Sequence, residues 1–215
     1  KHFSPRYNPW DQRLCLVPDS DLFTAIKNGS ATVVTDHIDS FTENGIQLKS
    51  GEHLDADIIV SATGLELVMM GGAEIAVDGE IVDFAKLWTY KGLMVSDVPN
   101  MVSTFGYINA SWTLRADLTA EWVCRTLNHM ANTNTTNVVP VVPANLQDMP
   151  VRSWIADFPA GYMQRMMHLF PKQGDQEPWI NTQDFRRDRA LFTQPLAKDT
   201  ALKFSTPLPP VAKSA

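Results

Sequence analysis

The stretch DIIVSATG, residues 57–64, constrains the fold of this chain more than any other feature of the sequence. Its apolar run, Ile58 to Val60, does not alternate with polar residues, and this pattern is typical of a strand buried on both faces of an α/β sheet. A buried strand that ends in small residues usually opens onto a ligand, yet no glycine-rich phosphate-binding loop follows Gly64. The stretch therefore predicts an α/β fold and raises the question of which ligand this strand serves.

The residues before this stretch predict a short helix and a small antiparallel β-meander. Leu22, Phe23 and Ile26 are spaced as one face of a helix, which Gly29 ends. Residues 31–62 then change to β-rich runs, which an Asn-Gly and a Ser-Gly turn signal interrupt. We expect this meander to lead directly into the buried strand at residues 57–62.

The residues after this stretch predict a helical C-terminal half. Apolar residues recur there at spacings of three and four, which is the period of a helix that buries one face. Proline-rich sequence at the end of the chain is typical of a loose tail. The expected elements are a buried strand at 101–105 that ends at Gly106, a long helix at 113–130, helical segments near 151–157 and 160–170, a helix capped by Asn181 or Thr182, and a tail at 195–215.

Charge and motif content argue against several classes of function. With 24 acidic and 18 basic residues the formal net charge is −6, so nucleic acid is not expected as a partner. No apolar run reaches the roughly 18–20 residues that a transmembrane helix needs. The histidines lack metal-binding spacing and no serine lies in a GxSxG elbow, which argues against a metal site and a triad hydrolase. Cys15 and Cys124 form no CxxC pair, which favours a reduced, cytoplasmic setting.

Four longer motifs together resemble those of the flavin-dependent monooxygenases, the class that includes Baeyer–Villiger and N- or S-oxidising enzymes. DADIIVSATG is similar to the signature with which that family passes from its NADP-binding domain back to its FAD-binding domain. HFSPRYNPWDQRLCLVPDSDLF resembles the subgroup related to the mycobacterial ethionamide-activating monooxygenase. INASWTLRADLTAEWV and PWINTQDFRRDRALF continue the resemblance, which covers about residues 1–192.

This resemblance implies a FAD- and NADPH-dependent enzyme that uses O2 to oxidise a small organic substrate, a ketone, thioether or amine. It would act through a flavin C4a-peroxide, by Baeyer–Villiger oxidation or S/N-oxygenation. A complete member carries two GxGxxG loops, and this sequence has neither. We therefore expect the C-terminal part of a flavoprotein with two dinucleotide-binding domains, inactive without the rest of its parent chain. Its expected parts are the end of the NADP-binding domain at 1–62, the C-terminal half of the FAD-binding domain at 63–194, and the tail at 195–215.

The resemblance also assigns site residues, each with a plainer alternative. Arg13 falls where the family places its active-site arginine; alternatively, it is a surface arginine paired with Asp11 or Asp19. Thr63 and Gly64 would form a hinge near the cofactors, or only a turn between strand and loop. The cofactor-binding residues expected around the start of the long helix, where ordinary N-capping is the alternative, are Gly106, Asn109, Ser111 and Trp112.

A second hypothesis assigns the chain to another functional class, that of binding or interaction domains without catalytic activity. The chain would be a non-catalytic α/β binding or interaction domain that derives from such a monooxygenase and has lost its activity. The absence of both glycine loops favours this hypothesis, whereas the retained segment PRYNPWDQR favours an active parent enzyme.

Overall fold

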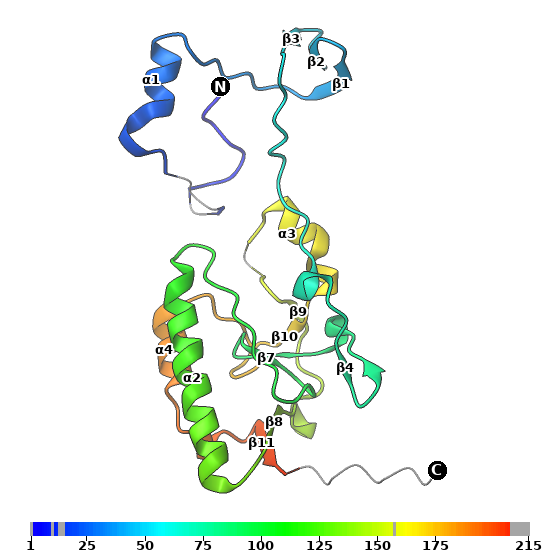
Figure 1. Ribbon diagram of the computed structural model, residues 1–215, viewed down its shortest axis with the longest axis vertical. Coiled ribbons are helices and arrows are strands. Elements are labelled where there is room, and N and C mark those ends of the chain that lie inside the picture. Colours follow the sequence, from blue (N-terminus) through cyan, green and yellow to red (C-terminus); the bar gives the residue numbers. More distant parts are fainter. Residues whose placement is uncertain (1, 10, 13–15, 157, 207–215) are drawn as a thin grey trace. The chain divides into compact units, whose positions relative to one another are not determined.

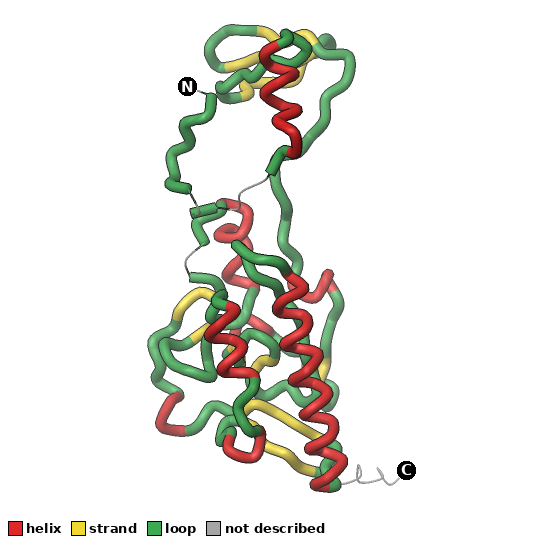
Figure 2. The backbone as a smooth tube through the Cα atoms, turned by 90° about the vertical axis from the view of Figure 1, so that its left-hand side faces the viewer, coloured by secondary structure: helices red, strands yellow, loops and turns green. Residues whose placement is uncertain are grey.

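The computed structural model describes residues 2–9, 11–12, 16–156 and 158–206 (Figure 1). The chain forms two compact units, residues 1–65 and residues 66–215. The architecture is α/β, with small antiparallel sheets and four α-helices among the described residues. Loops and turns, green in Figure 2, connect these short elements throughout the chain.

The first unit contains one helix and the predicted meander, and the structure confirms both. Its strands pair antiparallel in the order β1-β2-β3. Gly45 begins the second strand at the predicted Asn-Gly turn, and a Cβ atom there would lie 2.0 Å from the carbonyl oxygen of Leu54. Glycine is therefore required at position 45 for β2 to approach β3 this closely. The elements are η1 (Pro18–Ser20), α1 (Asp21–Lys27), β1 (Ile38–Thr42), β2 (Gly45–Leu48) and β3 (His53–Asp55).

The strand predicted at residues 57–62 is absent, so this prediction is wrong. β3 ends at Asp55, and the following residues form no ladder with any part of the chain that the structure describes. Ile58 and Val60 are each 82% exposed. A continuous apolar run predicts burial only where neighbouring strands cover both of its faces, and in this unit β1, β2 and β3 pair with one another. The run is an uncovered apolar segment.

The second unit is organised around α2 (Trp112–Thr133), which confirms the long helix predicted at residues 113–130. α4 (Phe185–Phe192) lies beside α2 in both views (Figures 1 and 2). None of the described helices is both long and apolar enough to cross a membrane. The other elements are η2 (Met69–Gly72), β4 (Ala76–Val77), β5 (Glu80–Ile81), η3 (Phe84–Lys86), β6 (Thr89–Tyr90), β7 (Met94–Val95), β8 (Asn137–Pro140), η4 (Ala144–Leu146), β9 (Arg152–Ser153), α3 (Gly161–Met166), η5 (Met167–Leu169), β10 (Lys172–Gln173), η6 (Leu196–Lys198) and β11 (Leu202–Ser205).

Large aromatic side chains form the main core of the second unit. Tyr90, Trp122 and Trp179 are almost completely buried. The ring of Tyr90 lies 6.3 Å from that of Trp122 and 5.9 Å from that of Trp179, in tilted and edge-on arrangements. Leu191 and Phe192 of α4 belong to the same cluster. Because aromatic side chains bury large areas, this cluster supplies much of the hydrophobic stabilisation of the unit.

A fully buried ion pair joins α2 to α4. Arg115 and Asp188 are both 0% exposed, and Nη1 of the arginine lies 2.8 Å from Oδ2 of the carboxylate. Nε and Nη1 make no aligned hydrogen bond with the described residues, whereas Nη2 donates to the carbonyl oxygen of Lys91 at 2.7 Å. The carboxylate also accepts hydrogen bonds from Tyr107 Oη at 2.8 Å and from Thr182 Oγ1 at 2.6 Å. One carboxylate thus joins α4 and the Thr182 segment before it to α2 and to the Tyr107 loop that precedes α2.

A second buried ion pair anchors part of the segment that was predicted as a tail. Lys91 Nζ lies 2.8 Å from Asp199 Oδ2, which also accepts a hydrogen bond from Tyr90 Oη at 2.5 Å. β11 follows directly, pairs with β8 and buries Leu202. The tail predicted at 195–215 is therefore wrong for residues 195–206, where η6 and β11 form and the strand pairs with β8. Residues 207–215 lie outside the described residues.

The predicted helical C-terminal half contains α2, α3 and α4, and it also contains strands that the sequence did not predict. The helical segment near 160–170 is confirmed by α3 and η5. The helical segment predicted near 151–157 is wrong for its described residues, because the structure has the strand β9 there, which pairs with β10. The strand predicted at 101–105 forms no ladder and makes one backbone hydrogen bond, from Ser103 N–H to the Leu93 carbonyl at 2.8 Å. α4 is capped by Asp184, whose carboxylate accepts two backbone hydrogen bonds of the first turn.

We predict that Asp188→Ala lowers the free energy of unfolding by about 3–5 kcal/mol, because the substitution leaves the buried Arg115 charge without a counterion. Urea unfolding followed by circular dichroism measures the change. Asp117→Ala, which removes an exposed carboxylate from α2, is the matched control and should change the value by less than about 0.5 kcal/mol. A loss below about 1 kcal/mol for Asp188→Ala would show that the pair does not support the packing of α2 on α4.

Candidate functional site

Four of the predicted cofactor-binding residues lie together, in the loop that leads into α2. Gly106 and Asn109 belong to the loop, Ser111 is the N-cap position, and Trp112 is the first residue of the helix. Thr63 and Gly64 belong to the first unit, where both are exposed. Arg13, the predicted catalytic residue, lies outside the described residues. The group that the structure brings together therefore consists of the four residues at the start of α2.

Gly106 has a packing role at this helix start. A Cβ atom on Gly106 would lie 2.1 Å from Cγ of Trp112, so the indole occupies the space that a side chain would need. The same indole contacts the ring of Phe105 at 5.0 Å between centroids, and Phe105 contacts Trp154 at 4.7 Å. Trp112 nevertheless remains 51% exposed. The glycine thus allows a large aromatic surface to be fixed in place while one part of it faces solvent.

The first turn of α2 suits a negatively charged group. The Ser111 side chain forms no capping hydrogen bond with a described backbone N–H of the helix, and the first turn carries no acidic residue. The hydroxyl of Ser111 instead lies 2.7 Å from that of Thr113. Backbone N–H groups of a first turn lack partners within the helix, and the aligned peptide dipoles make this end positive. The ordinary N-cap expected of Ser111 is therefore not formed.

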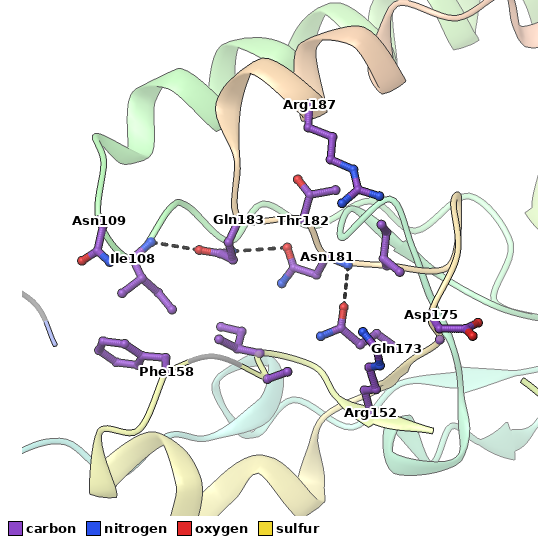
Figure 3. A pocket seen from close by; sticks show the side chains of 14 residues that line it. Ile108, Asn109, Arg152, Phe158, Gln173, Asp175, Asn181, Thr182, Gln183 and Arg187 are labelled. Carbon is purple, nitrogen blue, oxygen red and sulfur yellow. Dashed lines mark hydrogen bonds between the residues drawn. The ribbon is translucent and has the colours of Figure 1, made fainter. Parts of the chain in front are cut away.

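A polar cavity of about 270 Å³ adjoins this loop, and sequence reasoning did not find it. Figure 3 shows side chains from the loop before α2, from β9 and β10, and from the segment before α4 facing one space. Five of its described residues belong to the motif PWINTQDFRRDRALF and two to the motif INASWTLRADLTAEWV, and these two motifs were the signals of its position in the sequence. The cavity is lined by Ile108, Asn109, Arg152, Ile155, Ala156, Phe158, Gln173, Gly174, Asp175, Ile180, Asn181, Thr182, Gln183 and Arg187.

A chain of amide hydrogen bonds fixes the inner wall of this polar cavity (Figure 3). The backbone N–H of Ile108 donates to Gln183 Oε1 at 2.9 Å, and Gln183 Nε2 donates to Asn181 Oδ1 at 3.2 Å. The backbone N–H of Asn181 donates to Gln173 Oε1 at 3.0 Å. Gln173 Nε2 then donates to the carbonyl oxygen of Ser153 at 2.7 Å. These hydrogen bonds hold the wall in one arrangement.

The buried ion pair lies directly behind this wall. Thr182 lines the cavity and donates to Asp188, and a Cβ atom on Gly92 would meet both Arg115 Nη2 at 2.3 Å and Asn181 Oδ1 at 2.8 Å. Burial lowers the pKa of Arg115, an effect that the charge of Asp188 opposes. Burial, together with the hydrogen bond to Asp188, raises the pKa of Tyr107 well above its ordinary value. These buried groups therefore position the wall of the cavity.

A second cavity of about 200 Å³ is mainly apolar. Phe105 and Trp154 line it, and Phe105 also contacts the indole of Trp112 at the start of α2. Trp154 is buried, at 8% exposed, whereas Phe105 is half-buried. The other lining residues are Leu67, Val68, Met69, Met70, Thr89, Gly92, Met94, Val95, Met101, Ser103, Thr104, Phe170 and Pro171.

Among the described residues, no group of three or more His, Cys, Asp and Glu side chains is placed to hold a metal ion.

Comparison with known proteins defines the class of this chain's relatives, which are FAD-binding or FAD-containing monooxygenases. The resemblance predicted from the motifs is therefore confirmed. The relatives include a probable FAD-binding monooxygenase, AlmA, of Acinetobacter baylyi, which is 48% identical over 204 residues and 95% of this chain. They also include the FAD-containing monooxygenase EthA of Mycobacterium tuberculosis, 48% identical over 98% of the chain, and the putative FAD-containing monooxygenase MymA of the same species, 40% identical over 95%.

The chain spans 41–42% of the length of these relatives. No family model and no solved structure matches it. The similarity extends over both compact units, since it covers at least 95% of the chain. It therefore includes the start of α2, the polar cavity and the apolar cavity.

We predict that Gly106→Ala displaces the indole of Trp112, because the new methyl group would overlap the ring. Overpacking of this kind costs about 1–3 kcal/mol of the free energy of unfolding. Chemical denaturation measures the cost, and faster acrylamide quenching of tryptophan fluorescence reports the displacement. Gly161→Ala is the matched control, because its Cβ atom would only touch the flexible end of Arg165 at 3.3 Å. Equal stability and equal quenching in the two variants would contradict the packing role of Gly106.

Proposed function

We propose that this chain forms part of a FAD- and NADPH-dependent monooxygenase and that the start of α2 contributes to the FAD site. The observation that carries this proposal is the 46–48% identity to FAD monooxygenases over at least 95% of the chain, which includes the residues at the start of α2. Bound FAD would supply the redox chemistry and the activation of O2, and the protein would position it. NADPH is proposed as the reductant from the motif resemblance.

The residues at the start of α2 fit a flavin in two respects. The exposed indole of Trp112 offers an aromatic surface against which a flat ring system packs, and Gly106 and Phe105 hold that indole in place. The uncapped first turn offers backbone N–H groups and a positive dipole to the edge of a flavin, which becomes negative on reduction. Ser111 and Asn109 are proposed to border this contact.

The apolar cavity is the proposed site of the organic substrate. Its methionine and aromatic lining suits the hydrocarbon part of a ketone, thioether or amine, which would be oxidised with O2. Phe105 belongs both to this lining and to the contact with Trp112, so it connects the substrate cavity to the proposed flavin contact. Baeyer–Villiger oxidation and S- or N-oxygenation place the same demand on this cavity, which is to hold an apolar molecule and to exclude water.

Arg13 is proposed as the catalytic residue. A guanidinium remains protonated at every working pH, so it supplies a fixed positive charge where negative charge develops during oxygenation. Thr63 and Gly64 are proposed to lie at the hinge near the cofactors. The parts proposed for the chain remain 1–62 as the end of the NADP-binding domain and 63–194 as the C-terminal half of the FAD-binding domain.

The rest of the parent chain is the proposed partner of the first unit. Ile58 and Val60 are 82% exposed, and neither is paired within the described residues. Apolar runs of this kind are normally covered by neighbouring strands. Because the relatives are more than twice as long as this chain, we propose that the missing cover comes from the remainder of the same polypeptide. The non-catalytic binding domain is the less favoured hypothesis, since the similar proteins are named as monooxygenases.

We predict that Arg13→Ala in the complete polypeptide lowers NADPH-dependent oxygenation by about 100-fold or more, because one fixed charge is lost from the reacting centre. Product formation and NADPH consumption are measured together. Arg6→Ala is the matched control, since Arg6 is an exposed cation of the same segment, and it should retain full activity. Unchanged product formation in Arg13→Ala would refute the role proposed for this residue.

We predict that the chain of 215 residues binds FAD weakly by itself, whereas the complete polypeptide binds it with 1:1 stoichiometry. In the complete polypeptide, Trp112→Ala should weaken FAD binding about tenfold, which corresponds to the loss of one aromatic contact. Quenching of flavin fluorescence measures the affinity. Leu127→Ala, which removes an exposed apolar side chain further along α2, is the control. Tight stoichiometric FAD on the purified chain would contradict the dependence on the parent polypeptide.

A further inference from the structure

Two arginine side chains reach the polar cavity from opposite walls, Arg152 from β9 and Arg187 from the first turn of α4 (Figure 3). The guanidinium of Arg152 makes no hydrogen bond or ion pair with the described residues. Arg187 uses Nε to bind Glu177 Oε1 at 2.7 Å, which leaves its two terminal nitrogens without a partner in the described part of the chain. Both guanidiniums therefore keep the pair of parallel donors that binds a carboxylate in a bidentate manner.

Two guanidiniums supply the strong hydrogen-bond donors of the cavity. Among its described lining residues are Arg152, Arg187 and one carboxylate, that of Asp175, and Arg187 is ion-paired with Glu177. Arg152 is therefore a cation without a counterion in the described part of the chain, and Arg187 keeps two terminal donors. A guanidinium binds a carboxylate through parallel hydrogen bonds, so this pair of side chains favours an anion.

The deeper lining restricts the kind of anion. Ile155, Phe158 and Ile180 are at least nine-tenths buried and form an apolar floor. Gln173 and Asn181 are 7% and 6% exposed, and their hydrogen bonds fix them before any ligand enters. At about 270 Å³ the cavity is just below the size range of pockets for drug-sized ligands, so a dinucleotide is too large for it. A small molecule with one anionic group and a short hydrocarbon part matches all of these features.

We propose that the polar cavity binds a small organic carboxylate. Its carboxylate group lies between Arg152 and Arg187, and its hydrocarbon part packs against Phe158 and the two isoleucines of the floor. The apolar floor favours such a ligand over inorganic phosphate, which has no hydrocarbon part to bury. This binding site is separate from the proposed oxygenation and does not depend on it.

The test is isothermal titration calorimetry of the full chain at low ionic strength, with hexanoate, hexanamide and inorganic phosphate as separate ligands. Hexanoate should bind, and hexanamide, which has the same shape without the charge, should bind about tenfold more weakly or not at all. Phosphate should also bind more weakly than hexanoate. Arg152→Ala and Arg187→Ala should each weaken hexanoate binding about tenfold, while Arg152→Lys should lie between Arg152→Ala and the unmodified chain.

Arg186→Ala is the matched control, because Arg186 precedes Arg187 on α4 and does not line the cavity. It should leave the affinity for hexanoate unchanged, and Asp175→Asn should strengthen binding by removing a negative charge from the described lining. Circular dichroism verifies that each variant is folded. The proposal is overturned if hexanoate does not bind, if hexanamide or phosphate binds equally well, if Arg152→Ala and Arg186→Ala behave alike, or if Asp175→Asn weakens binding.

Discussion

The buried ion pair of Arg115 and Asp188 is the interaction on which the rest of the second unit depends. Removing two charges from water is costly, and the structure offsets this cost with hydrogen bonds that Tyr107 and Thr182 donate to Asp188 and that Arg115 donates to the Lys91 carbonyl. These bonds come from segments that are far apart in the sequence. The pair can therefore form only when α2, α4 and the segments that carry Lys91, Tyr107 and Thr182 have all reached their final positions, which makes the packing of this unit specific as well as stable.

The same interaction explains why the candidate sites lie where they do. Thr182 binds the buried carboxylate on one side and lines the polar cavity on the other. Tyr107 binds the same carboxylate one residue after Gly106, where the loop passes into the proposed flavin contact. The polar cavity and the start of α2 are thus two surfaces of one supported framework. A change at the ion pair would alter both of them, whereas a change at the exposed ends of Arg152 or Arg187 would alter only the cavity.

Some of this structure could be predicted from the sequence. The helix at α2 was found because its apolar spacing is regular over five turns, and the meander was found because glycine turn residues separate its strands. Short strands such as β9 were missed, since two residues carry no period and their pairing depends on distant partners. The position of the polar cavity could not be predicted, because its walls come from three separate segments and its two arginines look like ordinary surface residues in the sequence. The prediction of a strand at residues 57–62 failed for a different reason. The apolar pattern indicates burial, but it does not indicate which part of the polypeptide covers the run.

That uncovered run has a consequence for the behaviour of the chain in solution. Residues 58–60 present apolar side chains, and their backbone donors and acceptors form no ladder with the part of the chain that the structure describes; this is the arrangement that recruits another extended strand. Without a cover, the most available strand at high concentration is the same run in a second molecule. Self-association of the separated chain would then increase with protein concentration, and its solubility would be limited by these few residues and not by the stability of either folded unit.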